Sequence, residues 1–85
     1  MQDYEFTLEF ELQDPHADPA DYVEQLYESG CDDALIGIGR KGRISFDFIR
    51  EATSMAEARE SAIADIHQVL PFAILIELSK KILTY

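Results

Sequence analysis

Apolar and polar residues alternate over the first twelve positions of the chain. The apolar set is Tyr4, Phe6, Leu8, Phe10 and Leu12, and the polar set between them is Glu5, Thr7, Glu9 and Glu11. A repeat of two places successive side chains on opposite faces of a strand. We therefore expect a strand over residues 3–12, with its apolar face on a core and its acidic face toward water or a partner.

The stretch from 33 to 50 has the pattern of a β-hairpin, and the other elements can be placed against it. An apolar run from Leu35 to Gly39 leads into the basic turn Arg40-Lys41-Gly42. The following run alternates, with Ile44, Phe46 and Phe48 on one side and Arg43, Ser45 and Asp47 on the other. Two runs of β-branched and aromatic residues joined by a short glycine-bounded loop are typical of two antiparallel strands.

Two helices are predicted by their capping signals. Asp18 followed by Pro19 marks the start of a helix over 19–29, and Gly30 stands where a left-handed C-terminal cap is needed. Ser54, with Glu57 three residues later, forms a capping box that starts a second helix over 55–70. The expected buried positions are Tyr22 or Val23, Leu26 and Tyr27 in the first helix, and Met55, Ala58, Ala62, Ile63, Ile66, Val69 and Leu70 in the second.

Pro71 ends the second helix, and the apolar run 72–78 predicts a last strand, followed by a tail over 79–85. The order strand, helix, hairpin, helix, strand predicts one domain over 1–85 with an α+β, ferredoxin-like βαββαβ fold. Right-handed crossovers would place the first and third strands in the centre of an antiparallel sheet. Both helices would then cover one face of a two-layer sandwich.

The other face of the sheet is the predicted interaction face, because it combines polar residues with exposed aliphatic ones. Its expected members are Glu5, Thr7, Glu9, Glu11, Leu35, Gly37, Arg43, Ser45, Asp47 and Ile49. Exposed Leu35 and Ile49 suit sheet-to-sheet pairing. We therefore expect a homodimer, or another protein partner, to use this face.

Charge narrows the classes of partner. The chain of 85 residues has a formal net charge of −10, and no Lys or Arg occurs before Arg40. Nucleic-acid affinity comes mainly from cationic side chains, so we expect no direct contact with DNA or RNA. The single cysteine excludes an internal disulfide and fits a reducing, cytoplasmic setting. No apolar run approaches the roughly 18 residues of a membrane span, so no membrane contact is expected.

Three glycines of the hairpin match a nucleotide-binding pattern. Gly37, Gly39 and Gly42 spell G-x-G-x-x-G, whose chemistry needs a glycine turn from a strand into a helix N-terminus. Here the third glycine leads into a strand, so we interpret all three as hairpin glycines. The neighbouring Arg40 and Lys41 could contact an anion, although their expected role is a solvated tip that discourages pairing of strand edges.

No combination of residues predicts an enzyme or a cofactor site. Glu9 and Glu11 share a strand face and could act as general acid and base, but no nucleophile or histidine is predicted near them. Cys31 follows a helix end and is flanked by Asp32 and Asp33, whose charges disfavour a thiolate. We expect Cys31 to be a packed small residue.

Two regions contain residue types that bind metals. Asp14, His16 and Asp18 lie together in a predicted loop, and His67 has no second ligand three or four residues away on its helix. Neither has the spacing of a dedicated site. We therefore expect no metal beyond adventitious binding.

One segment of the chain resembles a known family. It runs Gly30-Cys31-Asp32-Asp33-Ala34-Leu35-Ile36-Gly37-Ile38-Gly39-Arg40 and continues with Gly42-Arg43-Ile44 and Asp47-Phe48. A similar G-C-D-D-A-L-x-G-I-G segment, after a Tyr-x-Phe-x-Leu opening strand, is found in the N-terminal α+β domain of a family of small bacterial DNA-binding proteins. The resemblance extends over about 3–76. In that family a helix-turn-helix follows the last strand, and the 85 residues leave no room for one. We therefore expect either the N-terminal module alone or a protein that has lost its DNA-reading domain.

The resemblance implies an association with transcriptional control, although the helix-turn-helix that binds DNA in that family is not among these residues. Together with the residues, it leads us to expect a non-enzymatic dimerisation or interaction module of a regulatory protein. A domain that senses a small-molecule effector is the alternative, because such folds often place effector sites between paired sheets. An enzyme is the third possibility.

Overall fold

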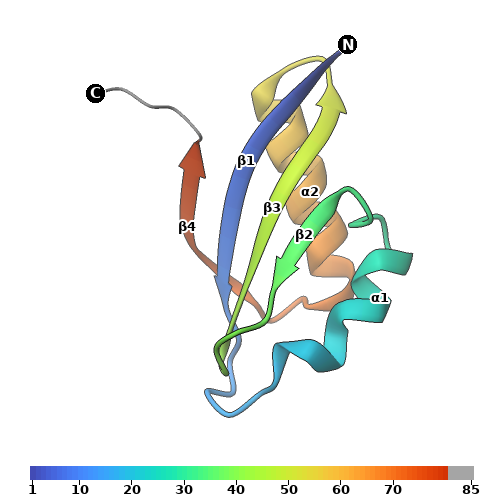
Figure 1. Ribbon diagram of the computed structural model, residues 1–85. Coiled ribbons are helices and arrows are strands. Elements are labelled where there is room, and N and C mark those ends of the chain that lie inside the picture. Colours follow the sequence, from blue (N-terminus) through green and yellow to red (C-terminus); the bar gives the residue numbers. More distant parts are fainter. Residues whose placement is uncertain (81–85) are drawn as a thin grey trace.

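The computed structural model describes residues 1–80 and contains four strands and two helices over that range (Figure 1). The elements are β1 (Gln2–Glu11), a 3-10 turn (Pro19–Tyr22), α1 (Val23–Glu28), β2 (Ala34–Gly37), β3 (Arg43–Ala52), α2 (Met55–Val69) and β4 (Ile74–Lys80). The first two residues of the predicted tail therefore belong to the last strand. The rest of that tail, 81–85, lies outside the described residues.

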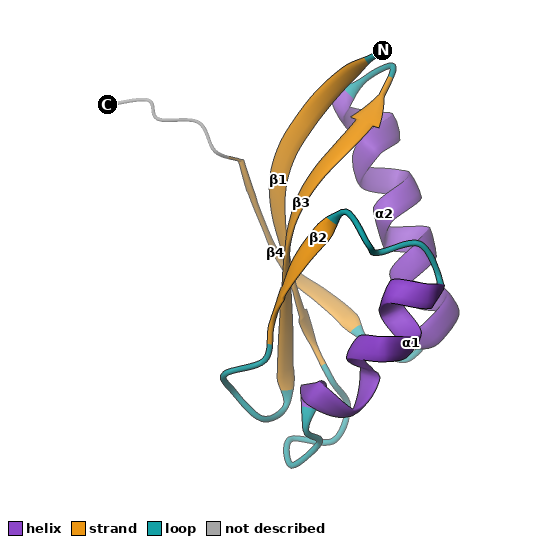
Figure 2. Cartoon of the chain, turned by 45° about the vertical axis from the view of Figure 1, so that its right-hand side comes forward, coloured by secondary structure: helices purple, strands orange, loops and turns teal. Residues whose placement is uncertain are grey.

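The four strands form one antiparallel sheet in the order β2-β3-β1-β4. The prediction that the first and third strands lie in its centre is confirmed. Both helices lie on the same side of the sheet, which leaves the opposite side uncovered (Figure 2). The described residues thus form an α+β structure of two layers, and no helix lies on the other side of the sheet.

The core lies between the sheet and α2, and the predicted alternation explains it. Phe6 and Phe48 face each other across β1 and β3, with ring centroids 5.3 Å apart. Burial of one such side chain stabilises the fold by about 2–3 kcal/mol. Small residues of α2 allow the helix to approach these rings closely. The main buried residues are Phe6, Leu8, Phe10, Ile44, Phe46 and Phe48 from the sheet, and Ala58, Ala62, Ile66 and Leu70 from α2 and its end.

The predicted helix caps at Asp18, Gly30 and Ser54 are all present, and Asp18 Oδ1 accepts from the backbone N–H of Ala20 at the start of the 3-10 turn. The backbone N–H of Glu57 donates to Ser54 Oγ at 3.1 Å, and Glu57 Oε1 accepts from the backbone N–H of Thr53 at 2.8 Å. At the end of α1, Gly30 has a φ of 120° and the N–H of Cys31 donates to the carbonyl of Leu26 at 3.0 Å. This is the six-to-one hydrogen bond of a Schellman cap. Gly30 directs the chain from α1 back toward the sheet.

Two boundaries differ from the sequence-based prediction. The first helix begins as a 3-10 turn, and its α-helical part is only six residues long. Leu26 is its fully buried residue, while Tyr27 lies one position further round the helix and is 41 % exposed, so the prediction that Tyr27 is buried was wrong. The last strand begins at Ile74, because a turn precedes it in which the N–H of Ala73 donates to the carbonyl of Leu70.

Candidate functional site

The side of the sheet away from both helices carries the predicted interaction face, and we call it the open face. Antiparallel pairing of β1 with β3 sets Glu5 opposite Ile49 and Thr7 opposite Asp47. Pairing of β2 with β3 sets Leu35 opposite Asp47. Because every second side chain of a strand shares a face, the structure brings the predicted residues together. They are Glu5, Thr7, Glu9, Glu11, Leu35, Gly37, Arg43, Ser45, Asp47 and Ile49.

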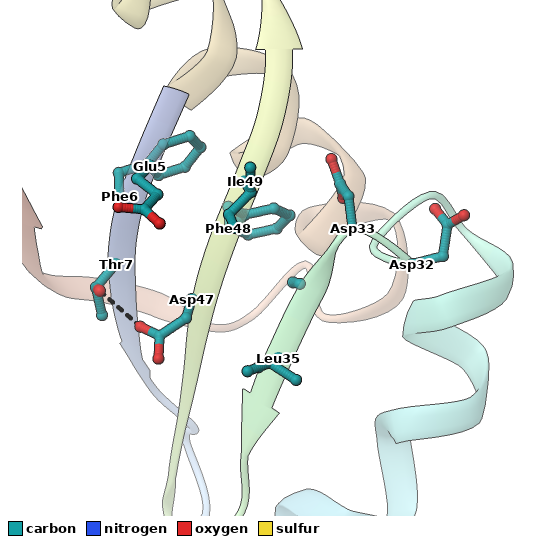
Figure 3. Close-up of a pocket in the computed structure, with 10 residues that line it drawn as sticks. Glu5, Phe6, Thr7, Asp32, Asp33, Leu35, Asp47, Phe48 and Ile49 are labelled. Atoms are coloured by element: carbon teal, nitrogen blue, oxygen red, sulfur yellow. Dashed lines mark hydrogen bonds between the residues drawn. The ribbon is translucent and has the colours of Figure 1, made fainter. Parts of the chain in front are cut away.

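A hollow of about 340 Å³ occupies one half of the open face, and we call it the acidic hollow (Figure 3). Leu35 and Ile49 stand beside it and are 75 % and 54 % exposed. Between these two side chains the hollow lies on the strands themselves, because Phe6, Ala34 and Phe48 turn their side chains into the core on the other side of the sheet. The lining residues are Glu5, Phe6, Thr7, Asp32, Asp33, Ala34, Leu35, Asp47, Phe48 and Ile49.

Four acidic residues are among those that line the acidic hollow, and they come from three different segments of the chain. Glu5 lies on β1, Asp47 on β3, and Asp32 and Asp33 on the loop that leads into β2. Thr7 Oγ1 donates to Asp47 Oδ1 at 2.6 Å, which fixes that carboxylate above the sheet. No lysine or arginine is among the lining residues within 1–80. The hollow is therefore apolar at its sides and negative in charge.

The other half of the open face lies near the hairpin turn and carries the positive charges. Arg43 Nη1 pairs with Glu9 Oε2 at 3.3 Å, diagonally across β1 and β3. Arg40 and Arg43 line a second hollow of about 210 Å³, together with Gly37 and Ser45. Lys41 is exposed at the turn and does not line this hollow. Of the two predicted anion contacts, only Arg40 lies at a concave surface.

A buried arginine forms a cluster that the sequence did not indicate. Arg50 continues the buried side of β3, is only 9 % exposed, and lies with its guanidinium 4.9 Å from the centre of the Phe48 ring. It donates to Asp33 through Nε at 2.8 Å and Nη2 at 3.0 Å, and Nη1 lies 3.0 Å from Asp65 Oδ2. It also donates to the carbonyl of Gly30 at 2.7 Å.

This arginine cluster joins the acidic hollow to the helices. Asp33 lines the hollow and binds Arg50, while Gly30 belongs to the cap of α1 and Asp65 to α2. The hydrogen bonds that Arg50 donates to the Asp33 carboxylate raise the pKa of Arg50, which stays charged. Asp33 is thus neutralised from behind the sheet, whereas Glu5, Asp32 and Asp47 make no ion pair within the described residues.

Cys31 is fully buried beside this cluster, as predicted. Burial raises the pKa of its thiol to about 11, and the carboxylate of Asp65 raises it further than Asp33 does. The flanking acids that the sequence suggested are therefore not the main cause. At neutral pH the thiol is protonated and enclosed, so it is not poised as a nucleophile.

The other sequence candidates serve local structure. Asp14 Oδ1 accepts from the backbone N–H of His16, and Asp18 Oδ1 accepts from that of Ala20. His67 Nε2 lies 3.1 Å from the carbonyl oxygen of Ala73. Glu11 lies opposite Arg43 at the end of β1, away from the acidic hollow. In the part of the chain that the structure describes, no group of three potential metal ligands comes together.

Comparisons of the chain with protein-family models, with curated proteins and with solved structures found no match. Among the described helices, none is long and apolar enough to cross a membrane. Function must therefore be inferred from the side chains of the chain itself.

Proposed function

We propose that this chain is a non-enzymatic interaction module of a small regulatory protein and that it binds a protein partner through the open face. The observation that carries the proposal is the exposure of Leu35 and Ile49 beside the acidic hollow, on a side that no helix covers. Covering them would remove apolar surface from water, which contributes about 25 cal/mol per Å². Two large aliphatic side chains at one concave surface are a common feature of binding sites.

The polar groups nearby support binding rather than catalysis. Asp47 accepts from Thr7, and Glu9 pairs with Arg43, so both carboxylates are held by neighbours on the sheet. The Cys31 thiol, with its pKa raised to about 11, is enclosed in the core. A general base or nucleophile needs access to a substrate and a pKa near the working pH. The Cys31 thiol has neither the access nor the activation, and the two carboxylates are engaged by their neighbours on the sheet.

We further propose that the fold is ferredoxin-like and that the protein has a regulatory role. The strand order β2-β3-β1-β4, with antiparallel neighbours, supports the ferredoxin-like arrangement. The regulatory role is drawn from the resemblance of the 30–40 segment to bacterial DNA-binding proteins. Within this segment Gly30 forms the cap of α1 and Asp33 binds Arg50. Both residues have a structural role that requires no contact with DNA.

Charge favours a different protein over a second copy as the partner. Asp3 lies opposite Glu51 at the far end of β1 and β3, beyond Glu5 and Asp47 on the same face. Pairing of two open faces would bring such carboxylates from both copies together, which is unfavourable at low salt. The expected homodimer is therefore the less favoured form of the proposal.

Selection from a random library of displayed peptides tests the proposed function. The immobilised domain is the target, and the double variant Leu35→Ser with Ile49→Ser is the matched control. We expect enriched peptides to bind the original domain and to lose at least about tenfold in affinity for the variant, since the loss of two buried aliphatic contacts costs more than about 1.4 kcal/mol. Enriched peptides that bind both proteins equally would overturn the proposal.

Sedimentation over a concentration series, at low and high salt, tests self-association. A monomer at all concentrations agrees with a different partner. A dimer that forms only at high salt and is lost in the double variant would show that a second copy can cover the open face once its charges are screened.

A further inference from the structure

We propose that the partner's contact segment is basic, with lysine or arginine next to an aliphatic residue, and that it binds in the acidic hollow. This inference rests on the proposed function and names the chemistry of the partner. It is drawn from two independent properties of the hollow, its uncompensated negative charge and its aliphatic sides.

Among the described residues, no cation balances most of the charge around the hollow. Glu5, Asp32 and Asp47 line it without an ion pair inside the described residues, and the only arginine near a lining carboxylate, Arg50, approaches Asp33 from the buried side. On the paired strands, Glu5 lies opposite Ile49 and Asp47 lies opposite Thr7, so neither carboxylate faces a cation directly across β1 and β3. A bound cation would therefore be attracted by both carboxylates at once.

The shape of the hollow fits a side chain with an aliphatic stem and a charged end. Leu35 from β2 and Ile49 from β3 stand beside it, and Glu5 and Asp47 present carboxylates next to them (Figure 3). Lysine and arginine bury their methylene groups on apolar surface while the charged group stays at the rim. A guanidinium could also form a two-bond contact with a carboxylate such as Glu5. A volume of about 340 Å³ accommodates such a side chain and a neighbouring aliphatic residue.

The same charge selects against other macromolecules. Phosphates of a nucleic acid and the anionic headgroups of a membrane would be repelled by Glu5, Asp32 and Asp47. The basic turn Arg40-Lys41-Gly42 of a second copy is the alternative source of positive charge. We commit to a different protein, since two copies would also bring their acidic halves close together.

Titration of the isotopically labelled domain with short blocked peptides tests the inference by NMR. The probe is a hexapeptide of alternating lysine and valine, and its matched control has glutamate in place of lysine. We expect only the lysine peptide to shift the amide signals of residues 5–7, 32–35 and 47–49. Its affinity should fall roughly tenfold between about 50 mM and about 300 mM salt, because salt screens exposed charges.

A pair of charge-matched variants separates a specific site from diffuse attraction. Glu5→Gln with Asp47→Asn should weaken binding of the lysine peptide about fivefold, as expected for the loss of two partly exposed ion pairs. Glu24→Gln with Glu28→Gln changes the net charge equally on the exposed side of α1 and should leave the affinity unchanged.

Four results would overturn the inference. They are shifts of the same amides by the glutamate peptide, equal losses in both variant pairs, no shifts with the lysine peptide, and concentration-dependent shifts of the same amides without peptide, which would identify a second copy. The first of these leaves the proposed function standing, because the open face would still bind a peptide. Failure of the display experiment would remove the proposed function itself.

Discussion

Two arginines of β3 lie on opposite faces of the sheet and differ in almost every physical respect. Arg50 is buried and contacts two carboxylates, a carbonyl and a hydroxyl, while the Arg43 side chain is 39 % exposed and pairs with one glutamate at 3.3 Å. On the buried face, arginine therefore links the sheet to α2. On the open face, its single ion pair can be broken and replaced by a contact with a partner. The buried face holds the fold, and the open face keeps charges and aliphatic groups available for a partner.

The electrostatics of the two faces differ in the same way. On the buried side, Asp33 and Asp65 each lie within hydrogen-bond distance of the Arg50 guanidinium, so each of these carboxylates has a cationic partner. On the open side, Glu5, Asp32 and Asp47 line the acidic hollow without such a partner among the described residues. Carboxylates without cationic partners on the open face contribute no ion pair to the stability of the fold. A partner with positive charge could therefore gain electrostatic binding energy at the open face, and much less at the buried face.

Among the substitutions of charged residues, the largest effect is predicted for Arg50→Met. The substitution leaves Asp33 and Asp65 without their cation, and removal of one partner from a buried ion pair costs about 3–5 kcal/mol. Since these two carboxylates keep about a third of their exposure, we expect the lower end, about 3 kcal/mol, in urea unfolding.

Arg43→Met is the matched control, with the same change of side chain on the same strand. Its expected cost is below about 0.5 kcal/mol, because an exposed ion pair is screened by water and salt. If Arg50→Met does not fold, Asp65→Asn should still lose about 1 kcal/mol, because it keeps the shape and removes one charge. Equal losses for the two arginine variants would contradict the comparison.

A smaller effect concerns Cys31 and appears only at high pH. The thiol of the unfolded chain titrates near 9.0 and that of the folded chain near 11, so the folded state holds the proton more tightly. The free energy of unfolding therefore contains a contribution that is complete below pH 9 and is lost as the pH rises from 9 to 11. Its size is about 2 kcal/mol.

Urea unfolding of the original chain and of Cys31→Ala, at several pH values from 7 to 11, measures this contribution. Lysines and tyrosines also titrate in this range, but they are common to both proteins, so the difference between the two isolates the thiol. We expect the original protein to lose stability more steeply above pH 9. Parallel pH profiles would mean that the thiol ionises as readily in the fold as outside it.

The strands and helices with a clear repeat could be predicted from the sequence. The alternation around Phe6 and Phe48 defined both the buried side and the open side, and Ser54 with Glu57 located the start of α2. Tyr27 was misplaced because α1 is too short, and its first turn too irregular, for a helical repeat to define its buried side.

The Arg50 cluster and the acidic hollow depend on contacts between residues far apart in the sequence. Such contacts could not be predicted from the sequence alone. Arg50 stands at the end of an apolar alternation, where an arginine normally marks the return to solvent. Only the fold brings it to Asp33, 17 residues earlier, and to Asp65 on α2. The acidic hollow likewise forms where the loop at Asp32 meets β1 and β3. The members of the open face were predictable, but its concave half was not.

The smallest effect is expected for Leu35→Ser and Ile49→Ser, and it completes the comparison of the two faces. Both side chains are more than half exposed, so their replacement should change the free energy of unfolding by no more than about 0.5 kcal/mol in urea unfolding. Phe48→Ala, one position from Ile49 on the buried face, should cost about 3–5 kcal/mol and is the matched control. A large loss in the serine variants would mean that these residues stabilise the sheet. Stability close to that of the original chain, combined with lost peptide binding, would show that Leu35 and Ile49 serve a partner and not the fold.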